Sequence, residues 1–203
     1  QATLDQTLHG LVQILGRRIG QANALALIVE ARLAAVGIGA VRIDFNGYED
    51  KLLKLWEGLG YYSRVRNMQR AAQQVMKEFD GDLPADYDAL LSLCGIGAYT
   101  AGAIASIAFD IPVPAVDGNV MRVLARLTAD DTDVLSAEGK KRFTALAWEL
   151  IPEFEAGRFN QALMELGETI CLPNGEPHCS ECPLQSQCAA FHSGRQNQLP
   201  VRI

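Results

Sequence analysis

The chain has 203 residues, of which 49% are hydrophobic and 21% charged, so it can bury one full core or two small ones without disulfides. Its formal net charge of −6 argues against a general polyanion binder, although a local basic patch and backbone N–H groups can still hold phosphate. No apolar run reaches the length of a membrane span and no secretory signal opens the sequence, which favours a reducing cytoplasm and no membrane partner.

Residues 1–47 differ in amino-acid composition from the rest of the sequence. Two stretches rich in Ala, Gly and Ile, 4–20 and 23–39, are each compatible with an amphipathic helix. Phe45 is the single aromatic residue before Tyr48. We interpret 1–47 as an atypical helical N-terminal segment.

From residue 48 onward the pattern is helical. Apolar residues recur at spacings of three and four in the stretches 52–59, 65–79, 88–108, 119–128, 142–151 and 160–170. Clusters of Gly, Pro and Asp separate these stretches, and alternating strand-like runs are absent from the sequence. The sequence predicts an all-α fold, with a helical domain over 48–170, a cysteine loop over 171–188, and a tail or linker over 189–203 toward an absent C-terminal domain.

The string KLWEGLGYYSRVRN, residues 54–67, combines a glycine turn with aromatic and basic side chains. Two glycines flank Leu59 and lead into Tyr61 and a second tyrosine, followed by Arg64 and Arg66. Such a turn can push a flat side chain into a base stack while the cations meet phosphates. Core packing of the aromatic pair is the alternative.

The string LLSLCGIGAYTAGAIASIAF, residues 90–109, predicts a helix end, a Gly-Ile-Gly turn and an Ala-rich helix. Gly95 and Gly97 permit the tight backbone and positive φ that a short turn between helices requires. The following helix N-terminus offers N–H donors to a phosphate oxygen. A plain αα-hairpin is the alternative, and Cys94 in the turn is interpreted as a small buried hydrophobe.

Four of the five cysteines lie in one loop, with the spacing C-x7-C-x2-C-x5-C. These residues are Cys171, Cys179, Cys182 and Cys188. A disulfide staple, a zinc ion and an iron–sulfur cluster are all conceivable, but zinc ribbons usually show two C-x2-C pairs and this loop has one. Four unevenly spaced thiolates suit a [4Fe–4S] cube. His178 could compete as a ligand, although four cysteines make it unnecessary.

Together these motifs resemble a family of DNA repair enzymes. The hairpin followed by V-D-G-N-V-x-R-V resembles the helix-hairpin-helix, Gly/Pro-rich, Asp superfamily, and 54–67 is closely similar to a block in adenine DNA glycosylases of the MutY type. The cysteine spacing is one residue longer than the C-x6-C-x2-C-x5-C of the endonuclease III and adenine glycosylase families. The resemblance covers Tyr48 to Arg202 and implies a helix-hairpin-helix DNA glycosylase fold with a C-terminal iron–sulfur cluster loop.

The resemblance also implies catalytic roles. Asp117 would stabilise the positive charge that develops on the sugar as the N-glycosidic bond breaks, or trap it covalently, although an N-cap would also explain an aspartate there. Lyase members carry a lysine where this chain has Tyr99, so the chain resembles the adenine-specific branch. Tyr99 and Asn119 would line the base pocket, with packing as the alternative for Tyr99.

For DNA binding, the resemblance implies a wedge and a set of phosphate contacts. Tyr61 would insert beside the base opposite the extruded adenine, with Leu59 close by. The DNA-binding residues so implied are Leu59, Tyr61, Arg64, Arg66, Gly95 and Gly97. A [4Fe–4S] cluster on Cys171, Cys179, Cys182 and Cys188 would order a loop that presents charge to phosphate, which is a structural role.

One expected residue is missing. Adenine glycosylases carry a glutamate upstream of the tyrosine block that protonates the adenine ring, in a string like S-E-I-M-L-Q-Q-T, and this string is not found here. Glu30 is the weak candidate for that acid, and a helix-surface carboxylate near Arg32 is the alternative.

The resulting hypothesis is a base-excision repair glycosylase that hydrolyses adenine from mispairs with 8-oxoguanine or guanine, with impaired excision if the acid is missing. The alternatives are a catalytically weak or inactive DNA-binding homologue and a glycosylase for another damaged base. The expected partner is double-stranded DNA containing a mismatched adenine. The protein is expected to be a monomer in the bacterial cytoplasm, associated with the nucleoid when bound.

Overall fold

The computed structural model describes residues 53, 57, 58 and 60–203, and over that part the fold is all-helical, as predicted. Its helices are α4 (Tyr62–Glu78), α5 (Tyr87–Ser92), α6 (Ala98–Phe109), α7 (Gly118–Thr128), α8 (Ala137–Leu150), α9 (Ala156–Thr169) and α10 (Ala189–His192), with 3-10 turns η1 (Cys179–Glu181) and η2 (Gln185–Gln187). None of these described helices is long and apolar enough to span a membrane. The segment 1–47, Glu30 and Leu59 lie outside the described residues.

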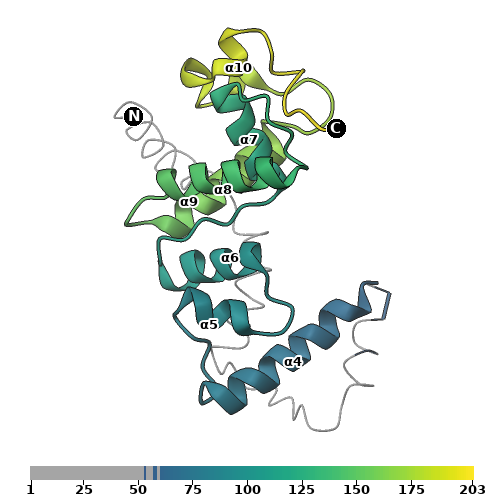
Figure 1. Ribbon diagram of the computed structural model, residues 1–203, viewed down its shortest axis with the longest axis vertical. Coiled ribbons are helices and arrows are strands. Elements are labelled where there is room, and N and C mark those ends of the chain that lie inside the picture. The colour runs from purple at the N-terminus through teal and green to yellow at the C-terminus, as the bar shows by residue number, and fades with distance from the viewer. Residues whose placement is uncertain (1–52, 54–56, 59) are drawn as a thin grey trace.

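The elements are distributed along the long axis of the molecule (Figure 1). Helix α4 and the α5–α6 pair lie at one end, α8 and α9 in the middle, and α7 leads to α10 and the cysteine loop at the other end. The connection from α6 to α7, residues 110–117, therefore joins the two halves, and Asp117 lies at its end.

The turn predicted at the Gly-Ile-Gly string divides the periodic run 88–108 into α5 and α6. Helices α8 and α9 begin before the apolar stretches that predicted them, α9 at Ala156 instead of 160. Helix α8 begins at Ala137, five residues before the predicted start at 142, because Ser136 caps it by accepting the Gly139 N–H at 2.9 Å. The first turn of α8 is polar, so apolar periodicity cannot reveal it.

Two hydrophobic cores correspond to the two halves. The first lies under α4, α5 and α6 and is formed by Val75, Leu90, Leu93, Ala101, Ala105 and Val113. The second lies between α7, α8 and α9 and includes Phe143, Phe159, Leu163, Leu166 and Leu184. Because Leu184 comes from the cysteine loop, that loop is part of the second core.

A buried polar network joins the halves. Asn160 on α9 is 1% exposed, and its Nδ2 donates to Ser106 Oγ at 2.8 Å and to the Val113 carbonyl at 2.9 Å. Its Oδ1 accepts the Ala115 N–H at 3.0 Å. All three polar functions of this side chain are thus satisfied, and they fix the segment that leads into Asp117.

Residues 189–203, predicted as a tail or linker, lie against α7 and the loop that follows it. Leu199 is 2% exposed, and its carbonyl accepts from Arg126 Nε at 2.8 Å. The Val134 N–H donates to the Val201 carbonyl at 3.1 Å. This segment closes over the second core, although its sequence shows no helical periodicity.

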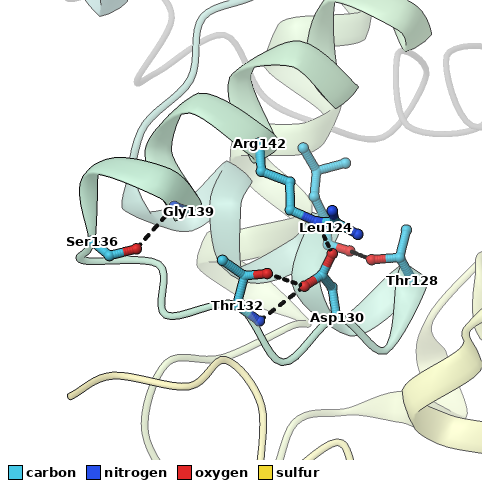
Figure 2. A network of polar contacts seen from close by, with 7 residues as sticks. All are labelled: Leu124, Thr128, Asp130, Thr132, Ser136, Gly139 and Arg142. Atoms are coloured by element: carbon cyan, nitrogen blue, oxygen red, sulfur yellow. Dashed lines mark hydrogen bonds and ion pairs between the residues drawn. The ribbon is translucent and has the colours of Figure 1, made fainter.

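The α7–α8 loop is organised by Asp130, as Figure 2 shows. Its Oδ1 accepts the N–H of Thr132 at 2.9 Å and the Thr132 hydroxyl at 2.6 Å, and its Oδ2 pairs with Arg142. Burial alone would raise the pKa of Asp130, but the Thr132 hydrogen bonds and the Arg142 charge outweigh it, so the pKa lies below the ordinary value.

Replacing Asp130 by asparagine is expected to lower the free energy of unfolding at neutral pH by about 1 kcal/mol. Because the folded pKa is depressed, the carboxylate contributes its stability above the ordinary value of 3.8 and loses it as the pH falls through the folded value. Denaturant unfolding of both proteins should therefore show a constant difference from about pH 5 to about pH 8 that narrows in acid. A difference that grows in acid would contradict this account.

Candidate functional site

Asp117 is the N-cap of α7. Its Oδ1 accepts the Val120 N–H at 2.8 Å, and its Oδ2 accepts from Asn119 Nδ2 at 3.1 Å. Asp117 therefore caps the helix, as the capping interpretation predicted. It does not exclude chemistry, because the side chain is only partly buried and both oxygens are held in one orientation at a positive helix end.

Asn119 connects Asp117 to a buried arginine. Its Oδ1 accepts from Arg122 Nη2 at 3.0 Å while its Nδ2 donates to Asp117. Arg122 is 1% exposed; its Nη2 also donates to the Gly167 carbonyl at 2.6 Å, and its Nε donates to the Cys171 carbonyl at 2.8 Å. A continuous chain of hydrogen bonds thus runs from Asp117 to the first cysteine of the loop. Both ends of the Asn119 amide are used in it, so Asn119 orients the carboxylate.

Tyr99, in the first turn of α6, lies close enough to Asp117 to feel its charge. Burial raises the pKa of Tyr99, and the carboxylates of Asp117 and Glu168 raise it further. The Tyr99 hydroxyl donates to Met164 Sδ at 3.7 Å. The structure therefore places Tyr99 near Asp117, which Asn119 contacts, and adds Glu168 from α9, which the sequence analysis did not single out.

The two hairpin glycines have different conformations. Gly95 has φ +77°, as predicted. The expectation of a positive φ at Gly97 was wrong: it has φ −93° and ψ 177°, because it is the N-cap of α6 and N-caps adopt extended geometry. A Cβ at Gly97 would meet no atom within 4 Å, so glycine there leaves open space before the helix N-terminus.

The aromatic turn is exposed. Gly58 and Gly60 have φ of +87° and +67°, and Tyr61 itself has φ +46°, a strained value for an aromatic residue. Tyr61 is 86% exposed, so core packing does not explain it. Arg64 and Arg66 on the next turn of α4 are also exposed.

The four loop cysteines line one cavity. The cavity is lined by the free thiols of Cys171, Cys179, Cys182 and Cys188. Arg126 and Phe191 also line it. Arg126 is 5% exposed, its Nη1 lies 3.2 Å from Cys171 Sγ as a donor, and the Cys188 thiol donates to the Arg126 carbonyl at 3.4 Å. The disulfide alternative is not realised in this part of the structure.

Burial affects how readily the cavity thiols lose their protons. Burial, with smaller contributions from neighbouring thiols, raises the pKa of Cys179 and Cys188 and raises that of Cys182 to about 11. Among the described residues no three ligand side chains approach as closely as those of one metal ion. Four thiols that line one cavity are the kind and number of donors that a four-iron cluster takes, one for each iron. The competing ligand His178 is exposed.

Arg122 and Arg126 were given no role by the sequence analysis. A signal was available, since both lie four residues apart in the apolar stretch 119–128, where a charged residue on the packed face needs a partner. The partners could not be inferred, because the carbonyls that accept from them belong to residues 45 to 73 positions away.

The chain is similar in sequence to proteins named adenine DNA glycosylase. The mouse adenine DNA glycosylase is 46% identical over 151 residues, covering 74% of this chain and 29% of the mouse protein. The adenine DNA glycosylase of Arabidopsis thaliana is 48% identical over 150 residues, covering 71% of this chain and 23% of that protein. The chain thus spans less than a third of the length of these relatives.

A solved structure of similar fold is a trapped endonuclease III–DNA covalent intermediate, an estranged-adenine complex. It matches with a TM-score of 0.67 at 23% identity and covers 95% of this chain and 97% of that one, which supports the predicted fold. The profile of HhH-GPD superfamily base excision DNA repair proteins matches residues 45–153, more than half of the sequence. The chain therefore belongs to the HhH-GPD superfamily of base excision DNA repair proteins.

Proposed function

We propose that this chain contains the catalytic domain of a DNA glycosylase that removes adenine mispaired with 8-oxoguanine or guanine. The observation that carries the proposal is Asp117, a carboxylate with both oxygens held by hydrogen bonds, close to Tyr99 and at the end of the segment that joins the two cores. The similarity to proteins named adenine DNA glycosylase supports adenine as the base.

Hydrolysis of an N-glycosidic bond transfers the bonding electrons to the base, which leaves as neutral adenine once its ring gains a proton. The sugar becomes cationic at C1′, and water then adds there and releases a proton. Asp117 is the group proposed to stabilise the sugar cation, because a fixed anion at that point needs no reorganisation as the charge develops. No amine stands at the position of Tyr99, so this route forms no Schiff base.

This mechanism also needs an acid that donates a proton to the adenine ring. Glu30, the weak candidate, lies outside the described residues and stays a prediction. A chain without this acid would bind mismatched DNA but excise slowly, since adenine leaves poorly as an anion.

For the duplex, we propose that Tyr61 inserts beside the opposite base while Arg64 and Arg66 contact phosphates. The 86% exposure of Tyr61 in a strained turn supports the wedge. The open space before Gly97 and the α6 N-terminus supports a backbone phosphate site at the hairpin. Such contacts are local, so they are compatible with a net charge of −6.

We also propose that Cys171, Cys179, Cys182 and Cys188 hold a [4Fe–4S] cluster. Bound there, it cross-links the loop to the second core. The buried Arg126 guanidinium lies beside one of these proposed ligands, with Nη1 3.2 Å from Cys171 Sγ.

The purified protein is expected to be brown and to contain about four iron atoms per chain. Iron analysis and the visible absorption spectrum check this. Stoichiometric zinc with a colourless protein would contradict it.

The enzymatic proposal is tested by single-turnover kinetics on a duplex with adenine opposite 8-oxoguanine, compared with binding to the same duplex. Excision supports the proposal, whereas tight binding without excision identifies the inactive DNA-binding homologue. Excision of another lesion from a panel would change the substrate. The monomeric state and the bacterial cytoplasmic location stay predictions.

A further inference from the structure

Helix α4 carries the aromatic turn at its N-terminus. Of its 17 residues, Val65 and Val75 are the ones whose side chains are buried. Figure 1 shows its C-terminal end beside α5 and its N-terminal end projecting away from α5 and α6. Buried side chains therefore lie near both ends of α4, Val65 in its first turn and Val75 in its last, while Tyr61 itself is exposed.

Two polar side chains on α4 contact the hairpin turn, residues 93–97. Gln74 Oε1 accepts the backbone N–H of Cys94 at 2.6 Å, and Asn67 Oδ1 accepts from the Cys94 thiol at 3.7 Å. A Cβ at Gly95 would lie 2.5 Å from the Cβ of Asn67, so the turn is pressed directly against that side chain. Since Asn67 and Gln74 are seven residues apart, they lie on one face of the helix.

These contacts determine the rotation of α4. Sliding the helix by one residue would turn Tyr61 by about 100° around the axis, away from its present direction. It would also leave the Cys94 N–H without its acceptor. An unsatisfied donor in a partly buried backbone costs free energy, so the present rotation is favoured.

We propose that Asn67 and Gln74 are positioning residues that set the register between the aromatic turn and the hairpin turn, so that both engage one duplex at once. The choice of duplex DNA as the ligand rests on the function proposed above. The residues themselves need not touch DNA, since they act through the direction of Tyr61 and the backbone at Cys94 and Gly95.

The test uses the full chain and four variants. Gln74→Met keeps the length of the side chain without an acceptor, Gln74→Glu keeps the acceptor, and Gln73→Met is the matched control at the exposed neighbouring glutamine. In hydrogen exchange of the free protein, segment 93–97 is expected to exchange about tenfold faster in Gln74→Met, and at the unchanged rate in the other two. Asn67→Ala is expected to give a smaller increase there.

With an undamaged duplex added, the unchanged chain should show protection at both 61–67 and 93–97. Gln74→Met should keep protection at 93–97 and lose it at 61–67, with a melting temperature close to that of the control. Gln74→Glu should retain protection at both segments, even if its added charge weakens binding overall. This rescue separates an acceptor role from general loss of packing.

Two results would contradict the proposal that Gln74 sets the register between the two turns. One is equal protection of both segments in Gln74→Met, and the other is a Gln74→Glu variant that behaves like Gln74→Met. If the unchanged chain shows no protection by any duplex, the proposed DNA-binding function fails. Exchange in the free protein then still decides whether Gln74 holds the turn, so the two failures are distinguishable.

Discussion

Replacing Asp117 by asparagine is expected to reduce the single-turnover rate of excision at least a hundredfold, roughly the scale set by losing one group that stabilises transition-state charge, while leaving duplex binding within about threefold. Asparagine can still accept the Val120 N–H, as the aspartate does at 2.8 Å, and it is as good an N-cap as aspartate. The substitution therefore removes the negative charge and keeps the helix start.

The matched control is Asp86→Asn. Asp86 caps α5 in the same way, with its Oδ1 accepting the Ala89 N–H at 2.8 Å, and belongs to a different helix from the proposed site. It should leave excision unchanged, and both variants should melt within a few degrees of the unchanged chain. If Asp117→Asn instead loses stability and binding in equal measure and keeps its rate per folded molecule, Asp117 is only a cap.

The sequence predicts the helix start at Asp117 but not the partners of Arg122, and both outcomes have one cause. Local signals such as a helix start after Val-Asp-Gly-Asn are encoded within a few residues, so Asp117 and the hairpin could be placed from the sequence. The partners of Arg122 are carbonyls of Gly167 and Cys171, which folding alone brings near. The sequence pattern predicts that a residue lies on the packed face of a helix, but it does not predict which distant backbone groups will contact that face.

The hairpin shows the same limit at a smaller scale. Two glycines predicted a tight turn, yet the sequence could not tell that Gly95 needs its positive φ while Gly97 serves as an extended N-cap. The crowding of Gly95 against Asn67, 28 positions earlier, is likewise a tertiary effect.

The extra residue between the first two loop cysteines has a local explanation. The His178 N–H donates to the Ile170 carbonyl at 2.9 Å, which joins the residues that immediately precede the two cysteines. Residues 172–177 therefore bulge between fixed ends, with Gly175 at φ +74°. The insertion lengthens the bulge and leaves Cys171 and Cys179 facing the shared cavity.

Arg122→Met is expected to have the largest effect on stability, because it removes the donor from three acceptors at once: Asn119 Oδ1, the Gly167 carbonyl and the Cys171 carbonyl. Buried acceptors left without a donor suggest a loss of about 3 kcal/mol in the free energy of unfolding. Arg158→Met is the control, since Arg158 pairs with Glu155 at the surface and its loss should change the free energy by less than about 1 kcal/mol.

The same variant tests whether the cysteine loop and Asp117 depend on each other. Without Arg122, Asn119 loses the partner that orients it toward Asp117, and the Cys171 backbone loses its anchor to α7. We therefore expect faster iron release during dialysis and slower excision by the fraction that remains folded, with duplex binding retained. Arg122→Lys keeps the charge but cannot reach three acceptors in a fixed fork, so it should recover part of the stability and little of the rate. A folded fraction of Arg122→Met that excises at the full rate would show that Asp117 needs no support from the loop, and would confine Arg122 to stabilising the fold.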